Sequence, residues 1–178
     1  GKAMTARESI LIVDDTPENL RVMSELLAPL GCQLLIANSG KRALEIVERI
    51  TPTLILLDVM MPDIDGFETC RRLRKMPELR DVPVLFVTAL TDEIQQGFAC
   101  GGNDYITKPI SPATVRARVR THLELRGAQK RLEKEAEVLA EQQLAPSYHA
   151  MSVPTATVGL KPNSRIRIGV ISDPPPIP

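Results

Sequence analysis

Short apolar runs and amphipathic stretches alternate five times along the chain, beginning at Ser9. The apolar runs are rich in Val, Ile and Leu, which is typical of parallel strands that are covered on both faces. Strands that alternate with helices indicate an α/β protein in which crossover helices join parallel strands. We therefore expect a five-stranded parallel sheet with strands at Ile10–Val13, Gln33–Ala37, Leu54–Leu57, Val84–Val87 and Tyr105–Thr107.

The stretches between these runs carry helix signals. Apolar residues recur at helical spacing after the first strand, at Leu20, Met23, Leu27 and Leu30. Gly31 follows them, and glycine commonly provides the left-handed residue that ends a helix. The other helices are expected at 43–47, opened by Asn38 or Ser39, at Phe67–Arg74, at Glu93–Cys100 and after Pro112.

The last expected helix does not stop where a compact domain would end it. Steps of four and three residues, the spacing of a heptad seam, run through Leu125, Gln129, Leu132, Ala136, Leu139 and Gln143. The seam is either a dimerising or signal-transmitting coiled coil or a solvated extension without a partner, and Gly127 weakens the helix in both cases. We expect a compact domain at 7–126, an extended last helix at 111–145 and a Pro-rich linker, tail or truncated segment at 146–178.

Charge and cysteine content narrow the class of protein. Lys plus Arg and Asp plus Glu each total 22, so net charge favours neither nucleic acid nor membrane binding. The three cysteines, Cys32, Cys70 and Cys100, are widely spaced, which disfavours a disulfide framework or a zinc site and fits a reducing cytosol. No apolar run approaches the length of a membrane span. We therefore expect a cytoplasmic protein.

Polar side chains stand where four of the expected strands end. They are Asp14 and Asp15 after the first strand, Asp58 after the third, Thr88 after the fourth and Lys108 after the fifth. Ligand sites in open parallel sheets lie beyond the carboxyl ends of the strands. The pattern therefore predicts one site that contains three acids, a hydroxyl and an ammonium group.

These residue types indicate phosphoryl chemistry. Three converging carboxylates repel one another, and oxygen ligands in an open cleft favour Mg²⁺ as the cation that offsets their charge. Asp58 follows four apolar residues and is the candidate nucleophile, because a carboxylate can attack phosphorus to form an acyl phosphate. Such a transfer needs positioning and charge neutralisation, which Mg²⁺ and Lys108 would supply, while Thr88 would donate to a phosphoryl oxygen.

The segments ILIVDD, LILLDVMMPDIDG, VPVLFVTA and DYITKPI resemble those of response-regulator receiver domains of bacterial two-component systems, over about Glu8–Arg126. The resemblance implies a flavodoxin-like, doubly wound sheet of order 2-1-3-4-5. It also implies that a histidine kinase or phosphotransfer protein phosphorylates Asp58. By the same resemblance, Mg²⁺ would be bound by Asp14, Asp15, Asp58 and the Met60 carbonyl. Lys108 would bind the phosphate, and its peptide bond to Pro109 would be cis. Thr88 and Tyr105 would form the switch pair.

The same resemblance implies a signalling domain and not an enzyme beyond its own phosphoryl transfer and slow dephosphorylation. Phosphorylation would change the face formed by the last strand and helix, and with it dimerisation through the last helix. Met60 and Leu90 flank the site at positions that, in the family, tune the lifetime of the phosphoryl group.

Two other classes are weighed against this interpretation. The first is an enzyme of the same architecture, such as a flavodoxin-like or haloacid-dehalogenase-like phosphotransferase with an aspartyl nucleophile. A flavin or nucleotide enzyme should carry a Gly-rich or hydroxyl-rich phosphate loop after the first strand, where this chain has DDTPEN. A pseudo-receiver, which docks a partner without phosphorylation, normally lacks an acid or the lysine, and all are present here. Singly, Asp14 and Asp15 also suit a helix cap and Lys108 a surface position, but their joint placement favours function.

Overall fold

The computed structural model describes residues 7–89 and 94–152, with the side chains of the last helix described as far as residue 144. The expectations for Leu90, for Glu93 as a helix start and for the tail from 153 to 178 lie outside the described residues.

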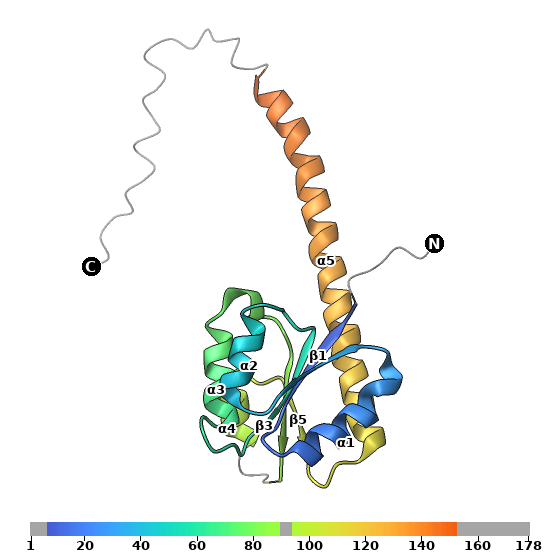
Figure 1. Ribbon diagram of the computed structural model, residues 1–178. Coiled ribbons are helices and arrows are strands. Elements are labelled where there is room, and N and C mark those ends of the chain that lie inside the picture. The colour runs from blue at the N-terminus through green and yellow to red at the C-terminus, as the bar shows by residue number, and fades with distance from the viewer. Residues whose placement is uncertain (1–6, 90–93, 153–178) are drawn as a thin grey trace, which may run out of the picture. The chain divides into compact units, whose positions relative to one another are not determined.

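A five-stranded parallel sheet of order β2-β1-β3-β4-β5 forms the centre of the fold (Figure 1). Its strands are β1 (Ser9–Val13), β2 (Gln33–Ala37), β3 (Leu54–Asp58), β4 (Val84–Thr88) and β5 (Asp104–Thr107). The order expected from the resemblance is confirmed, and each strand lies within one residue of its predicted bounds.

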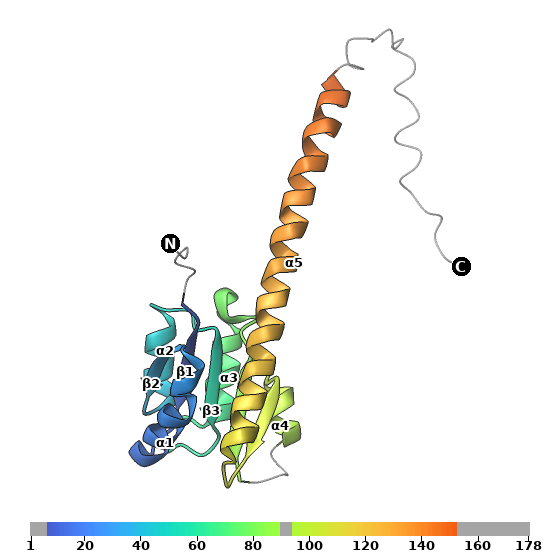
Figure 2. The same ribbon diagram turned by 90° about the vertical axis from the view of Figure 1, so that its right-hand side faces the viewer.

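Helices cover both faces of the sheet, as Figures 1 and 2 show. They are α1 (Pro17–Leu27), α2 (Gly40–Val47), α3 (Gly66–Arg74), α4 (Ile94–Ala99) and α5 (Pro112–Ser152), with 3-10 turns η1 (Ala28–Leu30) and η2 (Pro77–Leu79). The predicted helix stop is present at Gly31, whose φ of 75° is left-handed, and Ser39 caps α2 by accepting a bond from the Arg42 amide at 3.0 Å.

Two apolar clusters, one on each face, hold the helices to the sheet. Alternate residues of a strand point to opposite faces, so Ile10 and Ile12 pack with α1 and the start of α5. Leu11 and Val13 pack in the other cluster, with α2 and α3. Every residue of β1, β3 and β4 is buried, which explains why their sequences are nearly continuous apolar runs.

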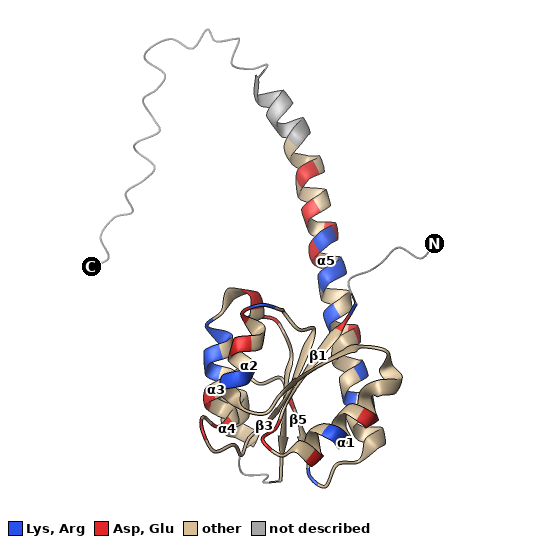
Figure 3. Cartoon of the chain, viewed as in Figure 1, with Lys and Arg blue, Asp and Glu red and all other residues tan. Residues whose placement is uncertain are grey.

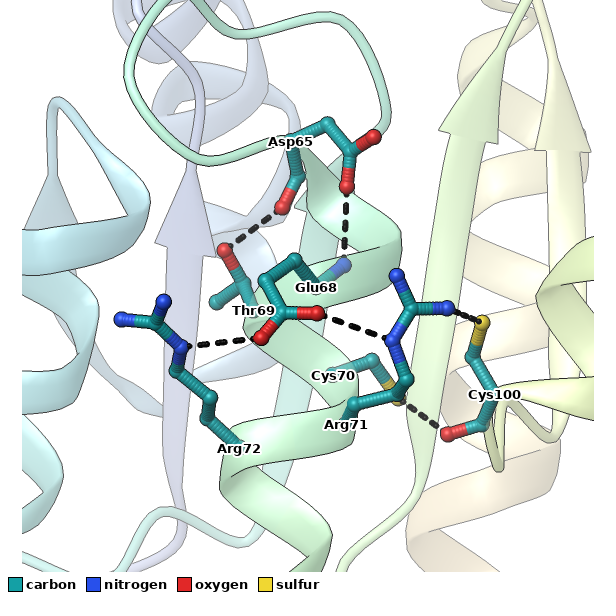
Figure 4. Close-up of polar contacts among 7 residues, drawn as sticks. All are labelled: Asp65, Glu68, Thr69, Cys70, Arg71, Arg72 and Cys100. Atoms are coloured by element: carbon teal, nitrogen blue, oxygen red, sulfur yellow. Dashed lines mark hydrogen bonds and ion pairs between the residues drawn. The ribbon is translucent and has the colours of Figure 1, made fainter.

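Side-chain contacts around α3 fix where this helix begins and how it meets the chain after α4 (Figure 4). Asp65 caps α3 by accepting a bond from the Glu68 amide at 2.8 Å. Glu68 pairs with Arg71 and Arg72 on the surface at 2.9 and 3.0 Å, where such pairs add little stability. Cys70 lies beneath them, with its thiol 3.4 Å from the Cys100 carbonyl oxygen. Burial raises the pKa of Cys70 to about 11, and all three cysteines are free.

Arg74, at the end of α3, joins the two segments that lead into β4 and β5. Its guanidinium donates to the carbonyls of Leu79 and Val82 at 2.7 Å each and to that of Gly101 at 2.8 and 2.9 Å. It also donates to Asn103 Oδ1 at 2.8 Å, and the same oxygen accepts a bond from the Val84 amide. Arg74 therefore fixes the entry of both strands whose far ends carry Thr88 and Lys108.

The last helix, α5, begins at Pro112 as expected and continues past residue 145 to Ser152. It passes Gly127 without a break, because a single glycine costs a helix only about 1 kcal/mol. Its residues Val115, Val119 and Leu123 are buried in the core. Within the described residues, no helix combines the length and apolar character needed to cross a membrane.

Candidate functional site

Three carboxylates meet at the carboxyl edge of the sheet. Asp14 follows β1 and Asp58 ends β3, and these neighbouring parallel strands pair Val13 with Leu57, so the two acids come side by side. Together with Asp15, each offers an oxygen that lies within 4.8 Å of the others. Asp14 and Asp58 are buried, at 7% and 4% exposed, whereas Asp15 is exposed. The expected convergence of the acids is therefore present.

Asp14 is held in place by hydrogen bonds. Its Oδ1 accepts a bond from the Thr16 amide at 2.8 Å, and its Oδ2 accepts one from Asn19 Nδ2 at 3.2 Å. These bonds hold the carboxylate in one orientation before any ligand arrives. The role of Asn19 was not predicted, although Asn19 is the last residue of DDTPEN and lies in the first turn of α1, close enough to Asp14 to reach it.

Lys108 supplies the positive charge of the site. Its Nζ lies 3.2 Å from Asp58 Oδ1, and its side chain is 30% exposed, so the ammonium group stands between Asp58 and solvent. The Lys108 amide donates to the Thr88 carbonyl at 2.8 Å, which ties the loop after β5 to the end of β4. The peptide bond from Lys108 to Pro109 is cis, as the resemblance implies.

The charge at Asp58 is incompletely balanced. Burial raises the pKa of Asp58, the nearby Asp14 raises it further, and Lys108 lowers it without cancelling the other two effects. One ammonium group thus offsets only part of the repulsion among three carboxylates. A cluster of oxygen ligands with an excess of negative charge fits a hard divalent cation, and Mg²⁺ prefers a few carboxylates over a closed protein cage.

The loop after β3 approaches the site very closely. A Cβ atom on Gly66 would meet the carbonyl oxygen of Asp58 and the Cα of Val59, so only glycine fits there. The Gly66 amide donates to the Val59 carbonyl at 2.9 Å. The Met60 side chain is 68% exposed. With Asp15 it lines an open cleft of about 470 Å³ beside the acids, together with Val59, Met61, Pro62, Asp65, Phe67 and Gln96.

Thr88 and Tyr105, the expected switch pair, lie on the neighbouring strands β4 and β5. Thr88 is buried at 4% exposed and Tyr105 is half-buried. Both line the same small cavity, which Phe98 of α4 also lines. The rings of Phe98 and Tyr105 meet edge to face with centroids 6.3 Å apart. The two residues thus border one small internal cavity.

A polar cluster that the sequence did not predict ties Tyr105 to α5. Arg118 donates to Asp104 Oδ1 at 2.7 Å and to the Tyr105 carbonyl at 2.9 Å, and its guanidinium lies 5.3 Å from the centroid of the Tyr105 ring. His122 Nε2 lies 2.9 Å from Asp104 Oδ2. Burial acts to raise the pKa of Asp104, but hydrogen bonds from His122 and the Tyr105 amide and the charge of Arg118 together lower it.

A sheet of this order, with three carboxylates and a lysine at its carboxyl edge, defines an α/β protein of the CheY-like fold. The family model of the response regulator receiver domain matches residues 10–120, and the chain belongs to this family.

Relatives and solved structures agree with this assignment. The probable transcriptional regulator ycf27 of Porphyridium aerugineum is 40% identical over 119 residues, which are 66% of this chain and 48% of that protein. Response regulator PleD of Caulobacter vibrioides is 43% identical over 121 residues, which are 66% of this chain and 26% of that protein. The chain thus matches about half or less of these relatives. The receiver domain of sensor histidine kinase PA1611 from Pseudomonas aeruginosa, with a magnesium ion coordinated in its active site cleft, superposes with a TM-score of 0.62 at 30% identity, over 67% of this chain and 99% of that one.

Proposed function

We propose that the chain accepts a phosphoryl group from a histidine kinase or phosphotransfer protein on Asp58, in a Mg²⁺-dependent reaction that switches the face formed by β5 and α5. One observation carries the proposal: the buried Asp58 carboxylate has Lys108 at 3.2 Å and two further acids within reach of a shared cation. This arrangement favours a phosphoacceptor. A docking module that works without phosphorylation needs neither a lysine nor further acids around a buried carboxylate.

Each residue then has a defined task. An oxygen of Asp58 attacks phosphorus, the bond between phosphorus and the donor breaks, and an aspartyl phosphate forms. Asp14, Asp15, Asp58 and the Met60 carbonyl would hold Mg²⁺, which would offset negative charge on the phosphoryl oxygens. Lys108 would move from Asp58 to a phosphoryl oxygen without leaving the site. The chain's own chemistry would be limited to this transfer and slow hydrolysis.

The switch would act through Thr88 and Tyr105. The Thr88 hydroxyl would donate to a phosphoryl oxygen that is absent before the reaction, which gives it a new position in the cavity that both residues line. Tyr105 would respond because it borders the same space. Since Arg118 binds the Tyr105 carbonyl and packs over its ring, a change at Tyr105 reaches α5 directly.

The test is phosphorylation of the purified chain with acetyl phosphate and Mg²⁺, followed by intact mass spectrometry. We expect the addition of one phosphoryl group and its loss in Asp58→Asn. The matched control is Asp63→Asn, an exposed acid in the loop after β3, which should retain full uptake. Unchanged uptake by Asp58→Asn would refute the assignment of the phosphoacceptor.

A further inference from the structure

Three leucines of α5 are more than half exposed and stand seven residues apart. Leu125, Leu132 and Leu139 are 59%, 65% and 56% exposed. Because seven residues make nearly two helical turns, these side chains form one apolar stripe along the helix. Such a stripe, flanked by charged residues, is the surface that one helix of a coiled coil presents to another.

The stripe is not a continuation of the face that α5 buries in the core. Val115, Val119 and Leu123 form the buried face. Successive residues of an α-helix are about 100° apart, so Leu125 lies about 160° around the helix from Leu123. The stripe therefore lies on the opposite side of the helix from the buried face.

We propose that residues 125–143 of α5 pair with the same residues of a second copy of the chain, as a parallel, in-register, two-stranded coiled coil. In this arrangement each seam residue faces its own copy, so Leu125, Leu132 and Leu139 form leucine layers. Gln129 and Gln143 also face their copies, and two amides can donate to and accept from each other. Polar residues at this heptad position are known to set register and strand number.

An antiparallel pair would place unlike residues together in the seam. The only antiparallel register that keeps all six seam residues in contact opposes Leu125 to Gln143 and Leu139 to Gln129. Each glutamine amide would then lie against a leucine instead of the matching amide, so the bond between the two copies would be lost.

Charge at the flanking positions also favours the parallel pair. Along the described part of α5, acidic residues become more frequent after residue 132 (Figure 3). In the antiparallel register, Glu133 would lie beside Glu133 of the second copy and Glu135 beside Glu135, and like charges repel. In the parallel register, Glu133 faces Ala128 and Glu135 faces Ala140, so these positions contain no like-charged pair.

Disulfide trapping in the full chain tests the orientation. In the parallel pair, Leu139→Cys lies beside its own copy and should form a linked dimer under mild oxidation, and so should Gln129→Cys. In the antiparallel pair the two copies of residue 139 are ten residues, or about 15 Å, apart, which is too far for a disulfide. Linkage only on mixing Leu139→Cys with Gln129→Cys would overturn the parallel arrangement. The unsubstituted chain controls for linkage through the native cysteines.

Sedimentation equilibrium tests whether the pair exists. The full chain should have twice the mass of one copy, and Leu132→Glu with Leu139→Glu should weaken association about a hundredfold or more. Val138→Glu is the matched control, since Val138 is 44% exposed on the same helix but outside the seam, and it should remain dimeric. A single-copy mass for the unsubstituted chain, or equal weakening by Val138→Glu, would overturn the proposal. Asp58→Asn should still dimerise, so this test is independent of the proposed phosphorylation.

Discussion

Replacement of Arg74 by lysine should destabilise the domain strongly, although the charge is kept. Arg74 makes five bonds of 2.9 Å or less, to the carbonyls of Leu79, Val82 and Gly101 and to Asn103. A lysine ammonium has three donors on one nitrogen and cannot reach acceptors on both sides of a planar fork. If two bonds are lost at about 1.5–3 kcal/mol each, the free energy of unfolding falls by about 3–6 kcal/mol, a large part of the 5–15 kcal/mol typical of a domain.

Urea unfolding followed by circular dichroism measures this loss. The matched control is Arg72→Lys in the same helix, because the Arg72 side chain is 49% exposed and pairs only with the surface residue Glu68 among the described contacts. We expect the control to change the free energy of unfolding by less than about 0.5 kcal/mol. A loss below about 1 kcal/mol in Arg74→Lys would refute the claim that the guanidinium fork holds the entries to β4 and β5.

Three further predictions concern the site itself. Because burial and Asp14 raise the pKa of Asp58, its ionised form opposes folding, so the contribution of Asp58 to stability without divalent cations should rise as pH falls from neutral through the raised pKa. Asp58→Asn should be more stable than the unsubstituted chain at neutral pH, by a margin that shrinks as pH falls; urea unfolding of both chains at several pH values would show a margin that grows instead if this is wrong. Adding Mg²⁺ should raise the melting temperature, and chelation should reverse the rise, with a smaller effect in Asp14→Asn; an equal effect in both would count against the acids as ligands. Gly66→Ala should cost about 1–3 kcal/mol and lower phosphoryl uptake, because its methyl group meets the Asp58 backbone; normal uptake and stability would show that the loop has room to move.

The fold was largely predictable from the sequence because strands of a parallel sheet are buried on both faces, and such strands are nearly continuous apolar runs. The strands β1, β3 and β4 are buried throughout, and their apolar runs mark them within a residue. The convergence of the site was predictable for a related reason, since residues that follow the carboxyl ends of neighbouring parallel strands are brought together by the ladder itself. Local signals sufficed at Gly31, where the left-handed conformation is observed.

The contacts of arginine were not predictable in this way. Arg74 lies in a helix beside other charged residues, a pattern that is typical of a solvent-exposed position. Most of its acceptors are backbone carbonyls, and no residue type in the sequence indicates them. Arg118 and His122 meet Asp104 across β5 and α5, and no local spacing relates residues on different elements. The order of the sheet followed from the family resemblance, because alternating strands and helices alone are compatible with several orders.

The electrostatics of the site connect these observations with the proposed switch. Three carboxylates and one lysine leave two negative charges in excess, which agrees with the raised pKa of Asp58. A divalent cation would bring the formal charge of the site to zero. Conversion of the Asp58 carboxylate to an acyl phosphate of charge near −2 would then add about one negative charge and new acceptor oxygens in the same pocket. Lys108 already contacts Asp58 before phosphorylation. The buried Thr88 hydroxyl, at the end of the neighbouring strand, would therefore move most to donate to a new phosphoryl oxygen. Thr88 and Tyr105 line one cavity, and Arg118 of α5 contacts Tyr105. A change of charge at Asp58 would therefore be transmitted through these three residues to α5, the helix that carries the leucine stripe.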